Sequence, residues 1–443
     1  MGGLGLQAMG IEWGTYVLVG SIFLLLVTGL PLAFVTGLVA LIFTVGWFGP
    51  NAIPLVISRV YGFITEYSLV AVPMFVFMAS LLDRSGIAKD LFNGMRVLAG
   101  RMPGGVALQT LVVGFFLATM SGIIGGEIVL LGILALPQML RLGYDRNLSI
   151  GIVCASGSLG TMIPPSIVLI IYGLMASVSI ADLFAAAFTP GTILAGLYAA
   201  YVLGRCLLNP SLAPRMELPP PEERRAQRIE AVKSVVMPAA IAFMVLGTIY
   251  AGIASVTEAA SMGVMGVLLA TAIRRELNAK LVHEACMQTI TTCGMIIWIG
   301  IGAATLVGVY NLMGGNRFVS ATILGIDAPP IVIIMVMQFI LIILGMFLDW
   351  IGIAMLTLPI FVPIVIQLGF SPIWFGILFC VNMQMSFLSP PFGPAAFYLK
   401  GVAPPGITLK HIFQSLLPFI VMQLVVLGLI LAFPNMVMWP LNH

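Results

Sequence analysis

The chain has 443 residues, of which 60% are hydrophobic and only 8% carry a charge. Soluble globular proteins carry about 25% charged residues, so this composition excludes that class and predicts a membrane protein. The net charge of +3 is too small to indicate a nucleic-acid partner, and the five cysteines show no metal-binding or redox spacing.

Long apolar runs follow one another along the whole chain. Residues 15–43 and 331–348 are two examples, and each such run is about long enough to cross a bilayer as a helix. We expect roughly ten to thirteen membrane segments, some of them too short to cross because Gly or Pro interrupts them. The predicted fold class is therefore an all-α polytopic membrane protein.

One long polar stretch divides the chain into two halves of similar size. Segment 205–233 carries six basic residues and a cluster of prolines, which indicates a linker outside the membrane. Because basic loops stay on the cytoplasmic side, we place this linker, and the short basic run 274–280, in the cytoplasm.

The two halves share a pattern of Gly and Pro residues. A shift of 226 positions brings Gly126 onto Gly352, and it also aligns the other pairs Pro137/Pro363, Gly143/Gly369, Cys154/Cys380 and Pro164-Pro165/Pro390-Pro391. Gly and Pro set backbone geometry, so their registration indicates an internal duplication.

Each half contains two interruptions of its apolar segments. The first is Gly-rich, in residues 121–129 and 345–352, and the second is the Pro-Pro pair. Two adjacent prolines cannot continue a helix, and non-helical backbone at membrane depth is tolerated where protein or a watery cavity surrounds it. We expect re-entrant hairpins and discontinuous helices, the features that mark a transporter's binding site. The alternative is simple kinks, since Gly and Pro are common in membrane helices.

Enzyme motifs are incomplete in this sequence. The segment HEACM, residues 283–287, has Met287 where a zinc-protease helix has its second histidine. No G-x-x-x-x-G-K loop for nucleotide phosphates occurs. We therefore predict a protein that is not an enzyme and that draws its energy from an ion gradient.

Four segments resemble the signature regions of one transporter family: VPMFVFMASLLDRSGIAKDLF, LPQMLRLGYDRNLSIGIVCASGSLGTMIPPSIVLIIYG, GTIYAGIASVTEAASMGV and LPIFVPIVIQLGFSPIWFGILFCVNMQMSFLSPPFGPAAFYLKGVAP. They are similar to the large membrane subunit of TRAP (tripartite ATP-independent periplasmic) transporters, and the resemblance covers residues 15–435. The end of the last segment, SFLSPPFGPAAFYLKGVAP, resembles a subgroup named mannitol/chloroaromatic.

The resemblance implies uptake of an organic acid, a carboxylate or sulfonate, across the bacterial inner membrane. Na⁺ would be the coupling ion, with no other cofactor. The implied partners are a small membrane subunit and a periplasmic substrate-binding protein. The implied mechanism is an elevator within a fold similar to the ion transporter superfamily, built from two inverted repeats. The alternative is a self-sufficient Na⁺/carboxylate symporter of similar fold, without a binding protein.

With this resemblance the chain divides into six regions. We assign N-terminal scaffold helices to 1–66, the first repeat to 67–204, the linker to 205–233, further scaffold helices to 234–284, the second repeat to 285–411 and a C-terminal helix to 412–443.

Two Na⁺ sites are expected at the interruptions, because an unwound segment offers several carbonyl and hydroxyl oxygens to a hard cation. For the first site we choose Ser121, Gly122, Gly125, Ser158, Gly160, Thr161 and Pro164. For the second we choose Gly345, Asp349, Ser386, Ser389 and Gly393. The alternative for any single Ser or Thr is a bond to its own helix, and for Asp349 it is a place at the membrane surface.

Candidates for substrate contact or coupling are Glu127, Gly126, Ser166, Pro165, Pro390, Pro391 and Glu258. Glu127 departs from the family pattern, since many relatives carry a small hydroxyl residue there. It could bind a cation or proton, pair with a basic residue of the scaffold or small subunit, or face water at the membrane surface. For Glu258 the alternative is a capping bond at a helix start.

Overall fold

The computed structural model describes residues 5–99, 102–122, 125–214, 221–325 and 327–441, and these residues form helices with no strand. Eight of the helices found there are long and apolar enough to cross a membrane. Five shorter apolar helices are Leu32–Phe48, Gly105–Met120, Ile167–Ala176, Pro330–Gly345 and Pro372–Leu388, and the last four belong to the interrupted segments. The predicted all-α membrane fold is confirmed.

The helices fall into two series. The first comprises α1 (Gly10–Val27), α2 (Leu32–Phe48), α3 (Ile53–Ile64), α4 (Ala71–Arg84), α5 (Ile87–Ala99), α6 (Gly105–Ser121), α7 (Gly126–Arg141), α8 (Arg146–Ser158), α9 (Ile167–Ala176) and α10 (Ile180–Leu208). The second comprises α11 (Pro221–Tyr250), α12 (Val256–Ile273), α13 (Ala279–Leu312), α14 (Gly315–Leu324), α15 (Pro330–Gly345), α16 (Trp350–Gln367), α17 (Pro372–Leu388), α18 (Pro394–Val402) and α19 (Leu409–Ala432), with the short α20 (Asn435–Met438) after it. Helix α11 begins inside the segment that the sequence predicts as a linker.

The two series are inverted copies of one another. Helix α8 begins at Arg146 and α17 at Pro372, which are 226 positions apart. Tyr172, near the end of α9, donates a hydrogen bond of 2.5 Å to the Pro372 carbonyl, so α17 starts where the α8–α9 path ends. In the middle, Gln384 donates to Ser158 at 3.4 Å, and these two are also 226 apart. Equivalent residues of two copies meet only near a twofold axis, so this contact marks the axis.

Two helical hairpins and two broken helices form the centre, which we call the hairpin core. The hairpins are α6–α7 and α15–α16, and the broken helices are α8–α9 and α17–α18. Helix α9 packs against α16 of the other copy, and α18 packs against α7. Each broken helix is therefore held by the hairpins of both copies, which brings the two interruptions of each half into one region.

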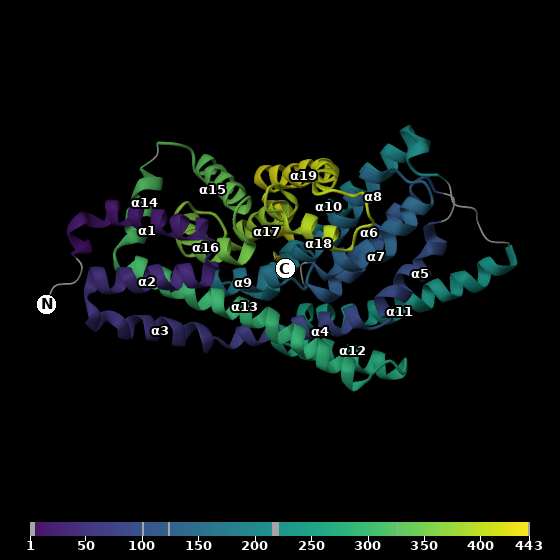
Figure 1. The fold of residues 1–443 in the computed structure, drawn as a ribbon, viewed down its shortest axis with the longest axis horizontal. Coiled ribbons are helices and arrows are strands. Elements are labelled where there is room, and N and C mark those ends of the chain that lie inside the picture. Colours follow the sequence, from purple (N-terminus) through teal and green to yellow (C-terminus); the bar gives the residue numbers. More distant parts are fainter. Residues whose placement is uncertain (1–4, 100–101, 123–124, 215–220, 326, 442–443) are drawn as a thin grey trace.

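The long helix α13 organises a second layer, the α13 layer. It packs along α2, α3 and α4, while α12 packs on α4. Figure 1 shows α3, α4, α12 and α13 along the lower side, below α15, α17 and α19. Gly302 allows the α2–α13 approach, because a Cβ there would collide with the Thr36 hydroxyl.

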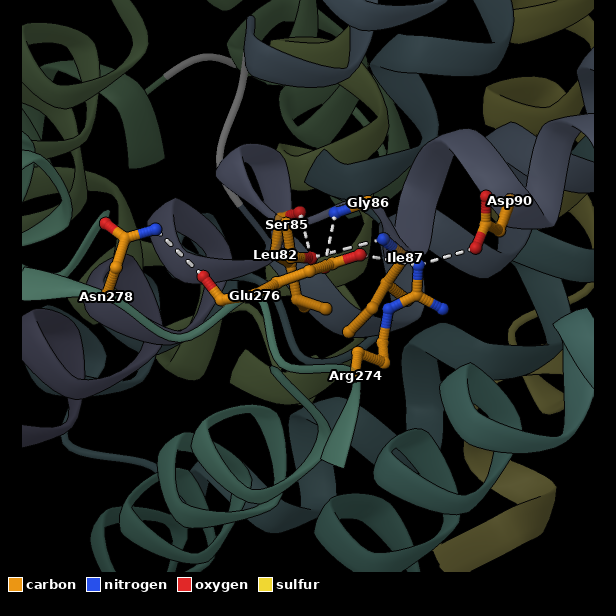
Figure 2. Close-up of polar contacts among 8 residues, drawn as sticks. All are labelled: Leu82, Ser85, Gly86, Ile87, Asp90, Arg274, Glu276 and Asn278. Carbon is orange, nitrogen blue, oxygen red and sulfur yellow. Dashed lines mark hydrogen bonds and ion pairs between the residues drawn. The ribbon is translucent and has the colours of Figure 1, made fainter. Parts of the chain in front are cut away.

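A polar cluster ties the α4–α5 connection to the loop between α12 and α13 (Figure 2). Arg274 donates to Asp90 at 2.5 Å and to Glu276 at 2.9 Å, and Glu276 accepts from the Gly86 N–H at 2.9 Å. A Cβ at Gly86 would lie 2.7 Å from Glu276 Oε1, so a larger residue there would displace the Glu276 carboxylate. The Arg274 hydrogen bond lowers the pKa of the Glu276 carboxyl below its usual value.

Within the part of the chain that the structure describes, basic residues concentrate at one end of the molecule, which we call the basic end. All of the 19 Lys and Arg residues except Arg59 and Arg317 belong to segments 84–101, 141–146, 205–233, 274–280 and 400–410. Hydrogen bonds join several of these segments, as between the Asp145 N–H and the Leu212 carbonyl at 2.7 Å. Arg59 in α3 and Arg317 in α14 are the two basic residues outside these segments.

Candidate functional site

A cavity of about 870 Å³ lies where the two hairpin tips face the α13 layer, and we call it the inner cavity. Arg84 and Gln288 line it from the parts of α4 and α13 nearest the basic end. The hairpin core and the start of α2 supply further lining residues, among them Gly122, Gly125, Gly126, Ile167, Asp349, Trp350, Phe387, Phe392, Pro394, Tyr398 and Leu32. Both hairpin tips and both broken helices therefore border one chamber.

The first hairpin tip is packed tightly against both broken helices. Gly122 has φ +57° and Gly125 has φ +112°, conformations that residues with a Cβ rarely adopt. A Cβ on Gly122 would collide with the Pro165 carbonyl, and one on Gly125 would lie 2.9 Å from the Tyr398 ring. The glycines predicted for this tip thus permit its contact with the first break and with α18. The side chain of Ser121 lies outside the described residues.

Glu127 is the second residue of α7 and is only 1% exposed. Both of its carboxylate oxygens lie 3.1 Å from the position that a Cβ on Gly160 would occupy. The carboxylate therefore sits over the turn that ends α8. The reading in which Glu127 faces water at the membrane surface is wrong, because the hairpin tip folds this side chain inward.

The first break is buried, and its hydroxyl groups donate to nearby carbonyls. Thr161 donates to the Ser158 carbonyl at 2.8 Å, and Ser166 donates to the Thr161 carbonyl at 2.6 Å. Ser158 donates to the Ala155 carbonyl at 2.9 Å. A hydroxyl whose hydrogen is engaged in this way presents its oxygen lone pairs to other groups. The oxygens of this break, together with the buried Gly160 and Pro164, suit a cation better than an anion.

The second tip and second break also meet. A Cβ on Gly345 would collide with the Ser386 hydroxyl, so the end of α15 lies directly on the end of α17. Ser386 and Ser389 each donate to the carbonyl four residues before them, at 2.9 and 2.8 Å. Gly393 precedes α18, and a Cβ on it would lie 2.8 Å from the Ser389 carbonyl oxygen.

Asp349 is the N-cap of α16 and lines the inner cavity. Its carboxylate accepts from the Ile351 N–H at 3.2 Å, as expected of an N-cap side chain. Glu258 is placed differently: it is exposed, is absent from the cavity lining, and forms a capping box with Ser255 at the start of α12. The structure joins the other described candidates at the two breaks but leaves Glu258 apart.

The α13 layer contributes polar groups that the sequence reasoning missed. Ser80, Asp83 and Arg84 of α4 line the inner cavity with Gln288 and Thr292 of α13. Asp83 Oδ2 lies 2.5 Å from the position of a Cβ on Gly126, so this carboxylate touches the first hairpin tip. In the sequence, the signal for these groups was the adjacent charged pair Asp83 and Arg84 at the end of an apolar segment.

Arg84 is held loosely in this wall. Its Nε lies 3.6 Å from Glu284 Oε2, and its Nη1 donates to the Ser80 carbonyl at 3.4 Å. Its side chain is 29% exposed, so the guanidinium is accessible to a ligand. Among the lining residues, Arg84 is the basic one.

Comparison with known proteins identifies the family of this chain. Residues 19–436 match the family model "Tripartite ATP-independent periplasmic transporter, DctM component". The chain belongs to this family. The resemblance found in the sequence is thereby confirmed, and so is the expectation that the protein is a transporter component and not an enzyme.

Relatives in the DctM family differ in their named substrates. The isethionate TRAP transporter permease protein DctMQ of Oleidesulfovibrio alaskensis is 30% identical over 93% of this chain and 64% of its own length. The C4-dicarboxylate large permease DctM of Vibrio cholerae is 27% identical over 94% of each chain. The sialic acid permease SiaT of Haemophilus influenzae is 28% identical over 84% of this chain and 59% of its own length. The chain thus spans less than two thirds of DctMQ and SiaT, and the mannitol/chloroaromatic subgroup stays a prediction.

A solved structure shares the fold. The YdaH transporter of Alcanivorax borkumensis matches with a TM-score of 0.63 at 16% identity, covering 89% of this chain and 91% of that one.

Proposed function

We propose that this chain is the large permease subunit of a Na⁺-coupled transporter that imports an organic acid, a carboxylate or sulfonate, across the bacterial inner membrane. One observation carries the proposal: two hairpin tips and two broken helices border a single cavity at the boundary with the α13 layer. This arrangement puts carbonyl and hydroxyl oxygens, the ligands that hard cations prefer, beside a chamber large enough for a small organic molecule.

Two features support Na⁺ as the coupling ion. The hydroxyls at both breaks donate their hydrogens to backbone carbonyls, so their oxygens are directed toward other partners. Two cations near the tips would also offset the carboxylates of Asp349 and Glu127, which otherwise repel an organic anion. We assign the first Na⁺ site to the break after Ser158 and the second to the break after Ser386.

Orientation follows from the distribution of basic residues. By the positive-inside rule the basic end faces the cytoplasm, and the inner cavity, lined by Arg84, then lies on the cytoplasmic side. In this reading the structure is inward-facing. The hairpin core would move against the α13 layer to expose the same tips to the periplasm, which is the elevator motion that the family resemblance implies.

The family description names a tripartite transporter. We therefore propose a small membrane subunit and a periplasmic substrate-binding protein as partners. The substrates in the relatives' names are a sulfonate, dicarboxylates and a sugar acid, which supports an organic acid as cargo.

The test is uptake in proteoliposomes that contain the chain with the small subunit. Accumulation should require an inward Na⁺ gradient and the cognate binding protein together, and collapse of the gradient should abolish it. Full uptake by this chain alone, without a binding protein, would instead support the self-sufficient symporter. Uptake that ignores Na⁺ would contradict both.

A further inference from the structure

A second pocket, of about 490 Å³, lies at the other end of the α13 layer, and we call it the outer pocket. It is bordered by Asn311 and Leu312 at the end of α13, by Leu174 near the end of α9, and by Arg59 and Glu66 around α3. Helix α13 starts near Arg84 at the basic end and finishes at this pocket. The two pockets therefore open at opposite ends of one helix.

The outer pocket is the repeat-related counterpart of the inner cavity. The 226-residue shift carries Glu66 onto Thr292, Leu69 onto Met295, and the pair Pro359 and Ile133 onto each other. Each member of these pairs lines its own pocket. Both pockets also lie between the α13 layer and a hairpin helix, α16 in one case and α7 in the other.

This relationship has a mechanical meaning in an inverted-repeat protein. Such proteins alternate by moving one unit against another, so the two copies exchange roles between the two states. The pocket equivalent to the open chamber is then the place where the chamber opens in the opposite state. The outer pocket is the smaller of the two, with 490 Å³ against 870 Å³.

Arg59 is the basic residue that lines the outer pocket. The stem of this side chain lies against Gly308, where a Cβ would be 2.7 Å from its Cγ and 3.0 Å from its Nε. Gly308 therefore leaves the space in which the guanidinium is held. Among the residues that the structure describes, no carboxylate lies within ion-pair distance of Arg59, although Glu66 lines the same pocket.

Each pocket thus contains one arginine from the α13 layer, Arg59 outside and Arg84 inside. A guanidinium presents a fork of donors that matches a carboxylate or a sulfonate in a bidentate fashion. We propose that the outer pocket is where the cargo first binds to this chain, and that Arg59 holds its anionic group there. This inference rests on the proposed function, since it takes the cargo to be an organic anion.

The experiment probes the pocket without knowledge of the substrate. Ser58 lines the outer pocket beside Arg59, and Ser58→Cys offers a thiol there. The full chain, reconstituted with the small subunit, is treated from the outer face with two impermeant methanethiosulfonates of similar size, one bearing a sulfonate and one a trimethylammonium group. The parent chain without Ser58→Cys gives the background from the five native cysteines.

We expect the sulfonate reagent to react faster than the ammonium reagent at this thiol. Adding Arg59→Gln should lower that preference about tenfold, and Arg59→Lys should restore part of it. Arg317→Gln is the matched control, because Arg317 is the other basic residue of this part of the chain, is exposed, and does not line the pocket. A charge preference that survives Arg59→Gln, or a thiol inaccessible from the outer face, would overturn the inference.

Uptake separates this inference from the proposed function. Arg59→Gln should raise KM for the cargo with little change in the maximal rate, whereas Arg317→Gln should leave both unchanged. Uptake that keeps the wild-type KM in Arg59→Gln would refute the role of Arg59 while the transporter assignment stands. A charge-selective pocket in a protein without Na⁺-coupled uptake would contradict the proposed function and leave the pocket assignment intact.

Discussion

The two Pro-Pro breaks are equivalent in sequence but not in environment. Pro164 and Pro165 are buried, whereas Pro390 and Pro391 are exposed. The first is covered by a hairpin tip, since Gly122 lies against the Pro165 carbonyl. The second is followed by Phe392, which lines the inner cavity. Duplication thus supplied two similar backbones, and the packing around them differs: one break is a sealed part of the core and the other faces the chamber.

The largest effect is expected from a substitution that disrupts the packing around the first break. Gly122→Ala adds a Cβ at φ +57° that would collide with the Pro165 carbonyl. We expect a loss of more than about 2 kcal/mol of stability from strain and overpacking, together with lost transport. Thermal unfolding of the purified protein measures it.

Gly428→Ala in α19 is the control for this substitution, because nothing lies within 4 Å of a Cβ there. Removing a helix glycine should leave the protein as stable or more stable, by up to about 1 kcal/mol. Equal unfolding temperatures for the two variants would contradict the sealed packing at the first tip.

Replacing each Pro-Pro pair by Ala-Ala tests the two breaks separately. Both changes let the helix continue through the break and redirect the carbonyls that we assign to Na⁺, so both should abolish transport with the protein still inserted. Because Pro164-Pro165 is buried and Pro390-Pro391 is exposed, the first variant should also lose more thermal stability. Wild-type Na⁺ dependence in either variant would refute the corresponding site.

Glu127 tests the charge beneath the first tip. Glu127→Gln keeps the shape of a side chain that is 1% exposed and removes its charge beside Gly160. If the carboxylate supports the first Na⁺ site, the Na⁺ concentration for half-maximal uptake should rise about tenfold, equivalent to ~1.4 kcal/mol of binding free energy. A Na⁺ titration of the uptake rate measures this shift.

Glu258→Gln provides the matched control for Glu127→Gln. Glu258 is exposed and caps α12, so its loss should leave the Na⁺ dependence unchanged. Identical titration curves for the wild type and the Glu127 variant would show that this carboxylate takes no part in coupling.

The elements with local signals were predictable from the sequence. Glycines and paired prolines fix where a helix ends, and their register exposed the repeat through Gly126 and Gly352. The contact between Ser158 and Gln384 could not be predicted from the sequence, because the two copies carry chemically different residues at this position. Glu258 became a candidate because a charge in an apolar segment suggests function, although its bonds to Ser255 are a local cap.

The wall of the inner cavity could not be predicted in the same way. Asp83 and Thr292 come from helices more than two hundred residues apart, and neither occupies a break or a glycine-rich segment. Their approach depends on the packing of α13 along α4, which is a tertiary property. Local patterns therefore identified the hairpin core of the candidate site, and only the assembled structure identified the α13 layer that faces it.

The smallest expected effect concerns the connections that lead into the two hairpins, which differ as the breaks do. The α4–α5 connection is clamped by Arg274 and Glu276 at Gly86, whereas the described residues around the equivalent α13–α14 turn at Gly314 contain no ion pair. Glu276→Gln should lower stability by less than about 1 kcal/mol at neutral pH, because the pair is partly exposed and screened by solvent. Arg275→Gln, at an exposed neighbour, is the control.

The pH dependence gives this last prediction its sign. Arg274 stabilises the charged form of Glu276 and lowers its pKa in the folded state, so the folded protein binds this proton less readily than the unfolded chain. The stabilisation is complete above the ordinary pKa of a glutamate and is lost as the pH falls through it toward the lowered value. Between about pH 7 and about pH 4 the wild type should therefore lose more thermal stability than Glu276→Gln. Parallel losses in the two proteins would show that the cluster in Figure 2 holds the connection through packing alone and not through charge.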